Sequence, residues 1–173
     1  YLQGAYLRDA NLQGANLQGA NLQGANLQGA YIQGAYLQGE YLGGAYLQGA
    51  YLQGAYLGGA YLQGAYLRDA YLQGAYLQGI KFDSKTILPT GETWQQYLNE
   101  VVPAYLTAGG HALREIVEAG CWECHSWENC PTAFAFDTHN SNDVPILLWP
   151  RRDQFIQLFD AGLIACPDPP WAD

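Results

Sequence analysis

Three cysteines and a histidine lie close together in the C-terminal half of the chain, in the run Cys121-Trp-Glu-Cys124-His125 and at Cys130. Thiolates and imidazole nitrogens at such spacings can share one tetrahedral zinc ion. The sequence therefore predicts a candidate zinc site of Cys121, Cys124 and Cys130, with His125 or His139 as the fourth ligand. Because the third cysteine breaks the two-residue spacing, free and mostly buried thiols are the simpler alternative. Reduced thiols would favour a cytoplasmic location.

Two other interpretations of the same cysteines stay open. The run from Cys121 to His125 has the CxxCH pattern, which resembles the haem attachment motif of c-type cytochromes. That resemblance covers these positions only, and the chain has no methionine that could be a sixth ligand. Disulfides are a second interpretation, but Cys166 is distant in sequence and the pairing cannot be deduced. Zinc is therefore the cofactor that we retain as a candidate. A protein without a cofactor is the simpler expectation.

No arrangement of residues points to an enzyme. The three histidines, His111 among them, have no serine or cysteine nucleophile motif around them. The glutamates between residues 115 and 128 are spaced as on a solvated helix face. The pair Gly109-Gly110 fits the end of a helix better than a loop that binds phosphate. We therefore expect a protein without catalytic residues.

The first 80 residues consist of sixteen five-residue units, which begin YLQGA YLRDA NLQGA NLQGA. A helix turns by about 100° per residue, so leucines five apart would not form one stripe. A flat sheet fails as well, because an odd period moves the leucines to alternate faces. A square coil with one unit per side satisfies the period: Leu and Ala point inward, and Gly allows the corner. Four units close a turn, and turns stack about 4.8 Å apart.

The run A-(N/Y)-L-Q-G resembles the pentapeptide-repeat family, whose pattern is A-(D/N)-L-x-x. The resemblance covers residues 1 to about 88. It implies a mainly β fold, a right-handed quadrilateral β-helix with about four coils. One departure is that the residue before Leu, usually Asp or Asn in the family, is Tyr in twelve units. The family's usual residue type remains in four units, at Asn11, Asn16, Asn21 and Asn26.

Residues 20 apart are expected to lie above one another on such a coil, so the tyrosines form columns. Offset stacking of rings at this spacing is worth about 0.5–1.5 kcal/mol per pair. The columns can simply stabilise the rod, or they can form a surface for binding or self-assembly. The candidate interaction residues are Tyr31, Tyr51 and Tyr71 on one face and Tyr36, Tyr56 and Tyr76 on the next.

Two features of the repeat call for local adjustment. Glu40 occupies an alanine position, between Ala20 and Ala60 of the neighbouring coils. Burial of its carboxylate is costly unless the group is protonated, hydrated or swung out by a local bulge. We expect a tolerated substitution with local distortion, and an ion or ligand site is the alternative. The first coil would also expose unpaired backbone groups, so we expect preceding residues or a second molecule to cover the rod end.

The chain changes character near residue 88, and we expect two domains, residues 1–88 and residues 89–173. Phe82 and Ile87 are expected to continue the leucine positions before Pro89 ends the coil. The second domain is predicted to be a small, mostly α-helical cap. Its predicted helices are a segment that begins after the N-cap Thr93, residues 112–119, residues 130–136 and a segment that begins near Pro150. The predicted core contains Trp94, Tyr97, Leu98, Val101, Leu113, Ile116, Val117, Trp149, Phe155, Ile156, Leu158 and Phe159.

Charge narrows the choice of function. The chain has a net charge of −9 and no basic stripe, so direct binding of nucleic acid is not expected. No stretch is long and apolar enough to predict a membrane span. We expect a non-enzymatic scaffold whose rod and cap mediate contacts with a protein partner or self-association.

Two alternatives to the scaffold stay open. One is the zinc module of Cys121, Cys124 and Cys130. The other follows from the resemblance, since some pentapeptide-repeat proteins mimic DNA and modulate type II topoisomerases. DNA mimicry needs acidic residues along the rod. Residues 1–80 carry two arginines and three acidic residues, a net charge of −1, so the charge disfavours this alternative.

Overall fold

The structure, a computed structural model, describes residues 1–119, 130–137 and 143–164. The chain divides into two units, Tyr1–Tyr97 and Leu98–Asp173, which are described separately below. Residues 89–97 lie in the first unit, where Ile87 also forms an antiparallel bridge with Thr93. The expected domain boundary at residue 88 stays a prediction. That the second unit caps the coil stays a prediction.

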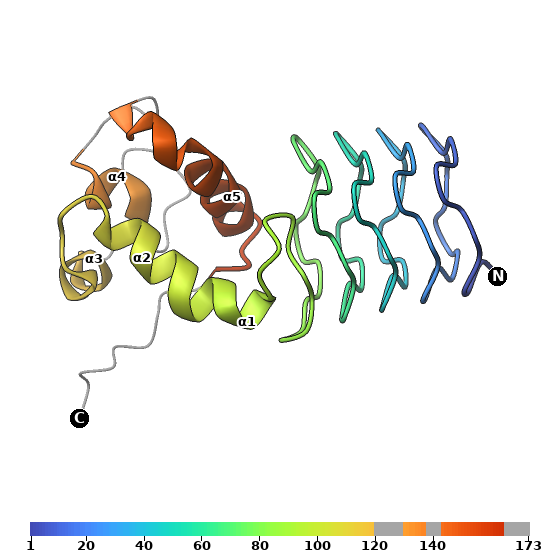
Figure 1. Cartoon of the computed structure of the whole chain (residues 1–173), viewed down its shortest axis with the longest axis horizontal. Helices are drawn as coiled ribbons and strands as arrows, with labels where there is room; N and C mark the ends of the chain where they lie inside the picture. Colours follow the sequence, from blue (N-terminus) through green and yellow to red (C-terminus); the bar gives the residue numbers. More distant parts are fainter. Residues whose placement is uncertain (120–129, 138–142, 165–173) are drawn as a thin grey trace. The chain divides into compact units, whose positions relative to one another are not determined.

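The first unit is a coil with a 20-residue turn. Each Asn or Tyr before a leucine forms a parallel β-bridge with the residue 20 positions later, from Tyr6 with Asn26 to Tyr61 with Lys81. Main-chain hydrogen bonds follow the same step: the amide of Leu22 donates to the carbonyl of Tyr41 over 2.9 Å. Because four units separate the bridged residues, each turn has four sides. Figure 1 shows the turns stacked on one another along the unit.

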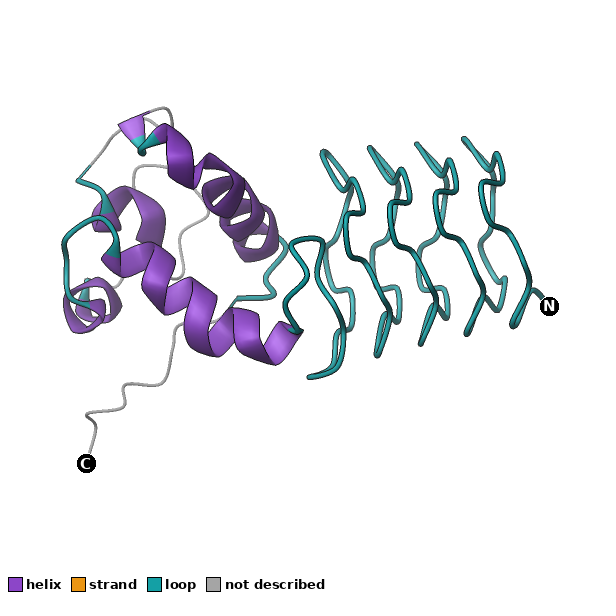
Figure 2. Cartoon of the chain, viewed as in Figure 1, coloured by secondary structure: helices purple, strands orange, loops and turns teal. Residues whose placement is uncertain are grey.

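The bridges are isolated, and the described residues contain no extended strand (Figure 2). The expectation of a mainly β fold is corrected in this respect. Two of every five residues form a turn, so each side has room for only one bridged residue before the next corner. The pairing is that of a parallel sheet, but it is divided into single rungs.

Each corner is a tight turn with its third residue in the left-handed region. In the unit that begins at Leu22, the amide of Ala25 donates to the Leu22 carbonyl over 3.0 Å, and Gly24 has φ +63°. This is the arrangement of a type II turn, which requires a positive φ at that position. Asp9 and Asp69 occupy the same corner with φ of +55° and +58°. Aspartate tolerates this region better than most residues, which explains the Arg-Asp variants of the Gln-Gly pair.

The leucines and alanines fill the interior, as the repeat predicts. Every leucine or isoleucine of the repeat from Leu22 to Leu67 is at most 2% exposed, and the alanines from Ala25 to Ala65 are fully buried. Burial of one such leucine side chain is worth about 1.5–3 kcal/mol. The interior of the rod is thus a continuous apolar core, in which alanine occupies the second inward position of every unit except those of Glu40 and Ile80.

The last coil contains one extra residue. The bridge partner of Tyr66 is Ile87, 21 positions later instead of 20. The expectation that Ile87 continues the leucine positions is therefore wrong. Ile87 takes the tyrosine position, and Leu88, which is 1% exposed, fills the interior. A turn at residues 83–86 accommodates the insertion: the Asp83 carboxylate accepts from the amides of Lys85 and Thr86, both over 3.0 Å.

A helical segment follows, and it begins where the sequence predicts. The Thr93 hydroxyl accepts from the amide of Gln96 while the Gln96 side chain accepts from the Thr93 amide, a capping box. The segment consists of α1 (Trp94–Gln96), the π-helix η1 (Tyr97–Val101) and α2 (Val102–Thr107). The wider π turn directly precedes Pro103, which has no amide to donate and crowds the preceding turn.

The second unit is a cluster of short helices. After α2 come α3 (Leu113–Glu118), α4 (Pro131–Ala135), η5 (Ile146–Leu148) and α5 (Trp149–Asp160). Among the described elements, α2 packs against α3, α4 and α5. None of the described helices is long and apolar enough to cross a bilayer.

The core of the second unit agrees with the prediction in part. Ile116, Phe155, Leu158 and Phe159 are buried as predicted. The predicted core residues that are only half-buried are Leu98, Val101, Leu113, Val117, Trp149 and Ile156. Sequence periodicity could not show which turn of a short helix faces its neighbours. Buried residues outside the predicted core include Val102, Tyr105, Leu106, Ala133, Ala135, Val144 and Ile164.

Candidate interaction surface

The tyrosines outside the rod form columns of stacked rings. Tyr31, Tyr51 and Tyr71 form one column, with ring centroids 5.0 and 4.9 Å apart and ring planes within 6° of parallel. Tyr36 and Tyr76 stack on the two faces of Tyr56 at 4.9 and 4.7 Å. The main-chain pairing sets this spacing, so the rings are held in register by the coil itself. Two further stacked pairs are Tyr41 with Tyr61 and Tyr46 with Tyr66.

The asparagines at the same positions of the earlier coils behave differently. The carboxamide oxygen of Asn11 accepts from the main-chain amide of Gln13 over 3.2 Å. A phenol cannot form this local bond, so tyrosine replaces one side-chain to main-chain hydrogen bond by contact between rings. The bonds at Asn16, Asn21 and Asn26, to the amides two residues later, have lengths of 3.0–3.2 Å.

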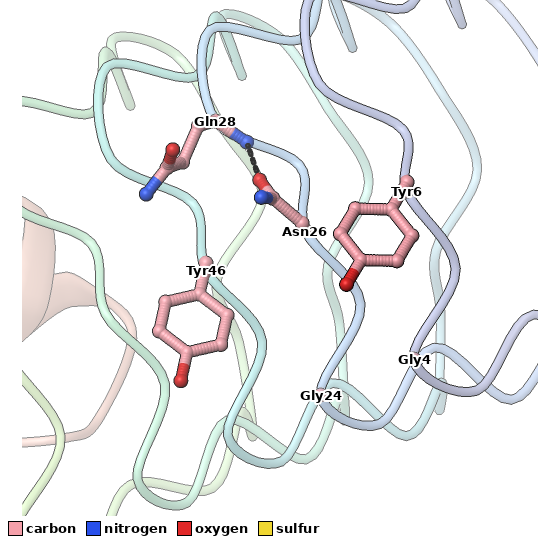
Figure 3. A pocket seen from close by; sticks show the side chains of 6 residues that line it. All are labelled: Gly4, Tyr6, Gly24, Asn26, Gln28 and Tyr46. Atoms are coloured by element: carbon pink, nitrogen blue, oxygen red, sulfur yellow. Dashed lines mark hydrogen bonds between the residues drawn. The ribbon is translucent and has the colours of Figure 1, made fainter.

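The surface is hollowed at Asn26, which lies between two tyrosines of its column. One hollow, about 260 Å³ in volume, is lined by Tyr6, Asn26 and Tyr46 with Gln28, Gly4 and Gly24. Figure 3 shows the rings of Tyr6 and Tyr46 on either side of Asn26, whose carboxamide is turned toward the main chain of Gln28. The sequence pattern could have shown this hollow, because it results from one Asn in a column of Tyr.

Polar side chains also form rows along the rod. The side-chain Nε2 of Gln13 donates to Oε1 of Gln33 over 3.2 Å. In the same way Nε2 of Gln18 donates to Oε1 of Gln38 over 2.9 Å. Charged side chains pair locally, with Arg8 Nε 3.6 Å from Asp9 and Arg68 Nε 3.9 Å from Asp69. Such exposed pairs contribute little free energy. The rod face is thus aromatic and amide-rich, with little net charge.

The family model of pentapeptide repeats matches residues 1–39 and 42–83 in 8 copies. Residues 1–83 belong to the pentapeptide-repeat family. The family assignment agrees with the 20-residue turn of the coil and with its inward Leu and Ala.

Solved structures of pentapeptide-repeat proteins are similar to the repeat half of this chain. HetL of the cyanobacterium Nostoc sp. strain PCC 7120, involved in heterocyst differentiation regulation, is 40% identical over 50% of this chain and 42% of HetL, with a TM-score of 0.43. The protein alr5209 of Nostoc PCC 7120 is 41% identical over 47% of this chain and 71% of its own, with a TM-score of 0.35. QnrB1, a plasmid-mediated fluoroquinolone resistance protein, is 20% identical over 45% of this chain and 44% of its own, with a TM-score of 0.27.

These likenesses are partial. The chain spans less than half of the length of HetL. No curated protein sequence matches it. What is said of HetL or QnrB1 therefore describes those proteins and is not transferred to this pentapeptide-repeat protein.

Inside the rod, Glu40 has found a main-chain partner. Its side chain is 3% exposed and accepts a hydrogen bond from the amide of Gly19 in the neighbouring coil. At equivalent corners this amide donates to a carbonyl, as Gly14 does to Gln33 over 2.9 Å. This hydrogen bond compensates part of the cost of burying the carboxylate, and it takes the place of a main-chain hydrogen bond of the coil.

The predicted zinc ligands are described only at Cys130. Cys121, Cys124, His125 and His139 lie outside the described residues, so the zinc site stays a prediction. The Cys130 thiol is buried and accepts from the amide of Ala133 over 3.4 Å at the start of α4. Burial raises the pKa of this thiol. Within the part of the chain that the structure describes, no group of three or more His, Cys, Asp or Glu side chains is arranged so that it could hold a metal ion.

One group of titratable residues in the second unit was not foreseen. His111 Nε2 lies 2.9 Å from the Asp137 carboxylate, and Nδ1 lies 3.4 Å from that of Glu115. The hydrogen bond to Asp137 raises the pKa of His111, and Glu115 adds to the effect. Glu115 also accepts a hydrogen bond from the Ala112 amide over 2.9 Å, so its carboxylate caps the N-terminus of α3. Residues 26 apart in sequence gave no signal for this contact.

Proposed function

We propose that this pentapeptide-repeat protein is a non-enzymatic scaffold whose rod contacts other proteins, further copies of itself among them, through its tyrosine columns. The supporting observation is that ten tyrosine side chains are each more than a third exposed, and eight of these ten are stacked on a neighbouring ring. They occupy all four columns of the coil. The eight are Tyr31, Tyr36, Tyr41, Tyr46, Tyr61, Tyr66, Tyr71 and Tyr76.

The order of these rings favours binding. Side chains that are immobilised on association lose conformational entropy, which weakens binding. A ring that is already stacked at about 4.9 Å, as Tyr36 is on Tyr56, has lost much of that freedom in the free protein. Tyrosine also combines a large apolar ring with a hydroxyl, which makes it frequent in protein interfaces. The columns therefore offer contact area at low entropic cost.

The two alternative functions have less support. Mimicry of DNA requires a row of negative charge, and the charged residues at two corners of the rod are Arg-Asp pairs that cancel. The likeness to QnrB1 is too distant to add to this alternative. For the zinc module, the cysteine that is described, Cys130, caps a helix through its sulfur. We therefore do not propose either of them as the function.

The proposal is tested by sedimentation velocity over a range of protein concentrations. In one variant Tyr31, Tyr51 and Tyr71 are all replaced by asparagine, which the repeat already has at this position in Asn11. The variant should fold, because asparagine restores the local bond to the main chain. We expect the wild-type protein to associate as its concentration rises and the variant to associate less. A wild-type protein that stays monomeric throughout, or an unchanged variant, would contradict self-association through this column.

A further inference from the structure

One column of the rod has a gap between two tyrosines. Positions 6, 26, 46 and 66 are bridged in succession and carry Tyr, Asn, Tyr and Tyr. Tyr46 stacks on Tyr66 with centroids 5.1 Å apart, so one face of its ring is covered. On its other side the next position of the column carries Asn26 in place of a ring (Figure 3). Since each coil adds about 4.8 Å, Tyr6 and Tyr46 are about 10 Å apart, with one ring position empty between them.

The asparagine leaves this gap open. Its carboxamide oxygen is held by the Gln28 amide over 3.2 Å, which draws the side chain against the main chain. The Gln28 side chain is held in turn by Gln48, also over 3.2 Å. Gly4 and Gly24 line the hollow and contribute no side chain. We call the space between Tyr6 and Tyr46, over Asn26, the Asn26 slot.

We propose that the Asn26 slot receives one aromatic side chain of a partner protein, which stacks between the rings of Tyr6 and Tyr46. A ring inserted midway would be about 4.8 Å from each, which lies in the range of favourable aromatic pairs. The hollow of about 260 Å³ is smaller than the pockets that hold drug-sized ligands, roughly 300–1,000 Å³, so it fits one ring. The inference rests on the proposed function, because it supposes that a protein surface meets the rod.

The exposure of the slot decides between a side chain and a free aromatic molecule. Tyr6 is 90% exposed, so the slot is open to water on its outer side. Contact with two ring faces alone would hold a free ring only at a dissociation constant on the order of millimolar. A side chain that belongs to a larger interface needs no such affinity of its own, because the surrounding contacts bring it to the slot. The neighbouring stacked tyrosines supply a surface for those contacts.

The other asparagines provide the controls. Asn16 has a tyrosine on one side of its column only, at position 36, so it has no slot. Asn21 lies between Tyr1 and Tyr41 and repeats the pattern of Asn26. The variant N21Y therefore serves as the starting protein, so that a single slot remains.

The test uses N-acetyl-tryptophanamide as the probe and NMR as the measurement, on the full chain. We expect ring-current shifts of the Tyr6 and Tyr46 ring protons and of the Asn26 amide, with a dissociation constant on the order of millimolar. Adding N26Y fills the slot and should weaken probe binding at least about tenfold. Adding N16Y, which introduces the same residue in a column without a slot, should leave binding within about twofold. N-acetyl-leucinamide should give no such shifts.

The results that would overturn the inference are distinct from those that concern the scaffold function. No shifts with the probe, or equal binding by the N26Y and N16Y proteins, would show that the slot does not take a ring. Replacement of Tyr6 by serine, which removes one wall and leaves Asn26 unchanged, gives a second measure and should also weaken binding. The sedimentation test changes a different column. Probe binding without self-association would refute self-association through the Tyr31 column and support the slot. Self-association without probe binding would support the proposed function and refute the slot.

Discussion

The main-chain amide of Gly19 donates a hydrogen bond to the carboxylate of Glu40, which lies 21 positions later in the chain. At most other corners the corresponding amide pairs with a carbonyl of the next coil, as Gly24 does with Gly43 over 3.0 Å. A buried side chain has thus replaced one rung of the coil. At this alanine position the polar side chain of Glu40 forms its hydrogen bond to the wall of the coil, whereas the apolar Ile80 at the equivalent position of the last unit is buried in the core.

Replacement of Glu40 by alanine should stabilise the rod. The substitution removes a buried carboxylate and allows the Gly19 amide to donate to the Gln38 carbonyl, the repeat equivalent. We expect the free energy of unfolding to rise by about 1 kcal/mol, measured by urea denaturation. E40Q keeps the size without the charge and should fall between the two proteins. A less stable E40A protein would show that the Glu40 bond is stronger than the rung it replaces.

The tyrosine columns should stabilise the rod in proportion to the number of ring contacts. Tyr56 stacks on two neighbours, whereas Tyr76 stacks on Tyr56 alone among the described stacked pairs. We expect Y56N to cost about 1–3 kcal/mol of unfolding free energy and Y76N about half as much. Both variants gain the same local asparagine bond, so the difference in their denaturation midpoints reports stacking. Equal losses at the two positions would mean that contact between rings contributes little.

The carboxylate of Asp83 should make the stability of the rod depend on pH. Its partial burial raises its pKa, but hydrogen bonds from the amides of Gly64, Lys85 and Thr86 outweigh that effect and lower the pKa below the ordinary 3.8. The stabilisation is therefore complete above the unfolded value and is lost as the pH falls through the folded value. We expect D83N to destabilise the rod by about 1–2 kcal/mol at neutral pH.

The measurement for Asp83 is the urea midpoint at a series of pH values. The D83N protein should lose less stability than the wild type as the pH falls from about 5 to about 2, since its side chain does not titrate. The control is D69N, which changes an exposed aspartate at a corner of the same rod and should leave both the midpoint and its pH dependence close to wild type. A D83N profile parallel to that of the wild type would contradict the role given to this carboxylate.

Cys130 should act as a helix cap rather than as a metal ligand. Serine is a good N-cap, so C130S should keep the stability of the second unit, whereas C130A should lose about 1 kcal/mol. Helical circular dichroism during denaturation measures this. Elemental analysis of the same proteins tests the zinc alternative. Loss of zinc from C130S together with loss of stability would favour the metal site, and an unchanged metal content would favour the cap.

The sequence alone was sufficient for the rod. A period of five with inward Leu and Ala leaves few ways to bury those side chains together, so the coil, its corners and the columns of tyrosine all follow from local pattern. The N-cap Thr93 was equally readable, because a capping box depends on residues three apart. These features depend on residues close together in the sequence or on a strict repeat, and both can be recognised from the sequence alone.

Tertiary structure decided what depends on packing between segments without a repeat. The extra residue before Ile87 shifted the inward position to Leu88, because the pairing with Tyr66 had to be kept. The contact of His111 with Asp137 joins two segments that share no sequence pattern, so only the folded chain brings these residues together. Short helices bury whichever face meets a neighbour, so periodicity could not select Tyr105 and Leu106 of α2 for the core of the second unit. In the repeat, the spacing along the sequence determines which residues contact one another. In the helical unit, those contacts depend on how the helices pack.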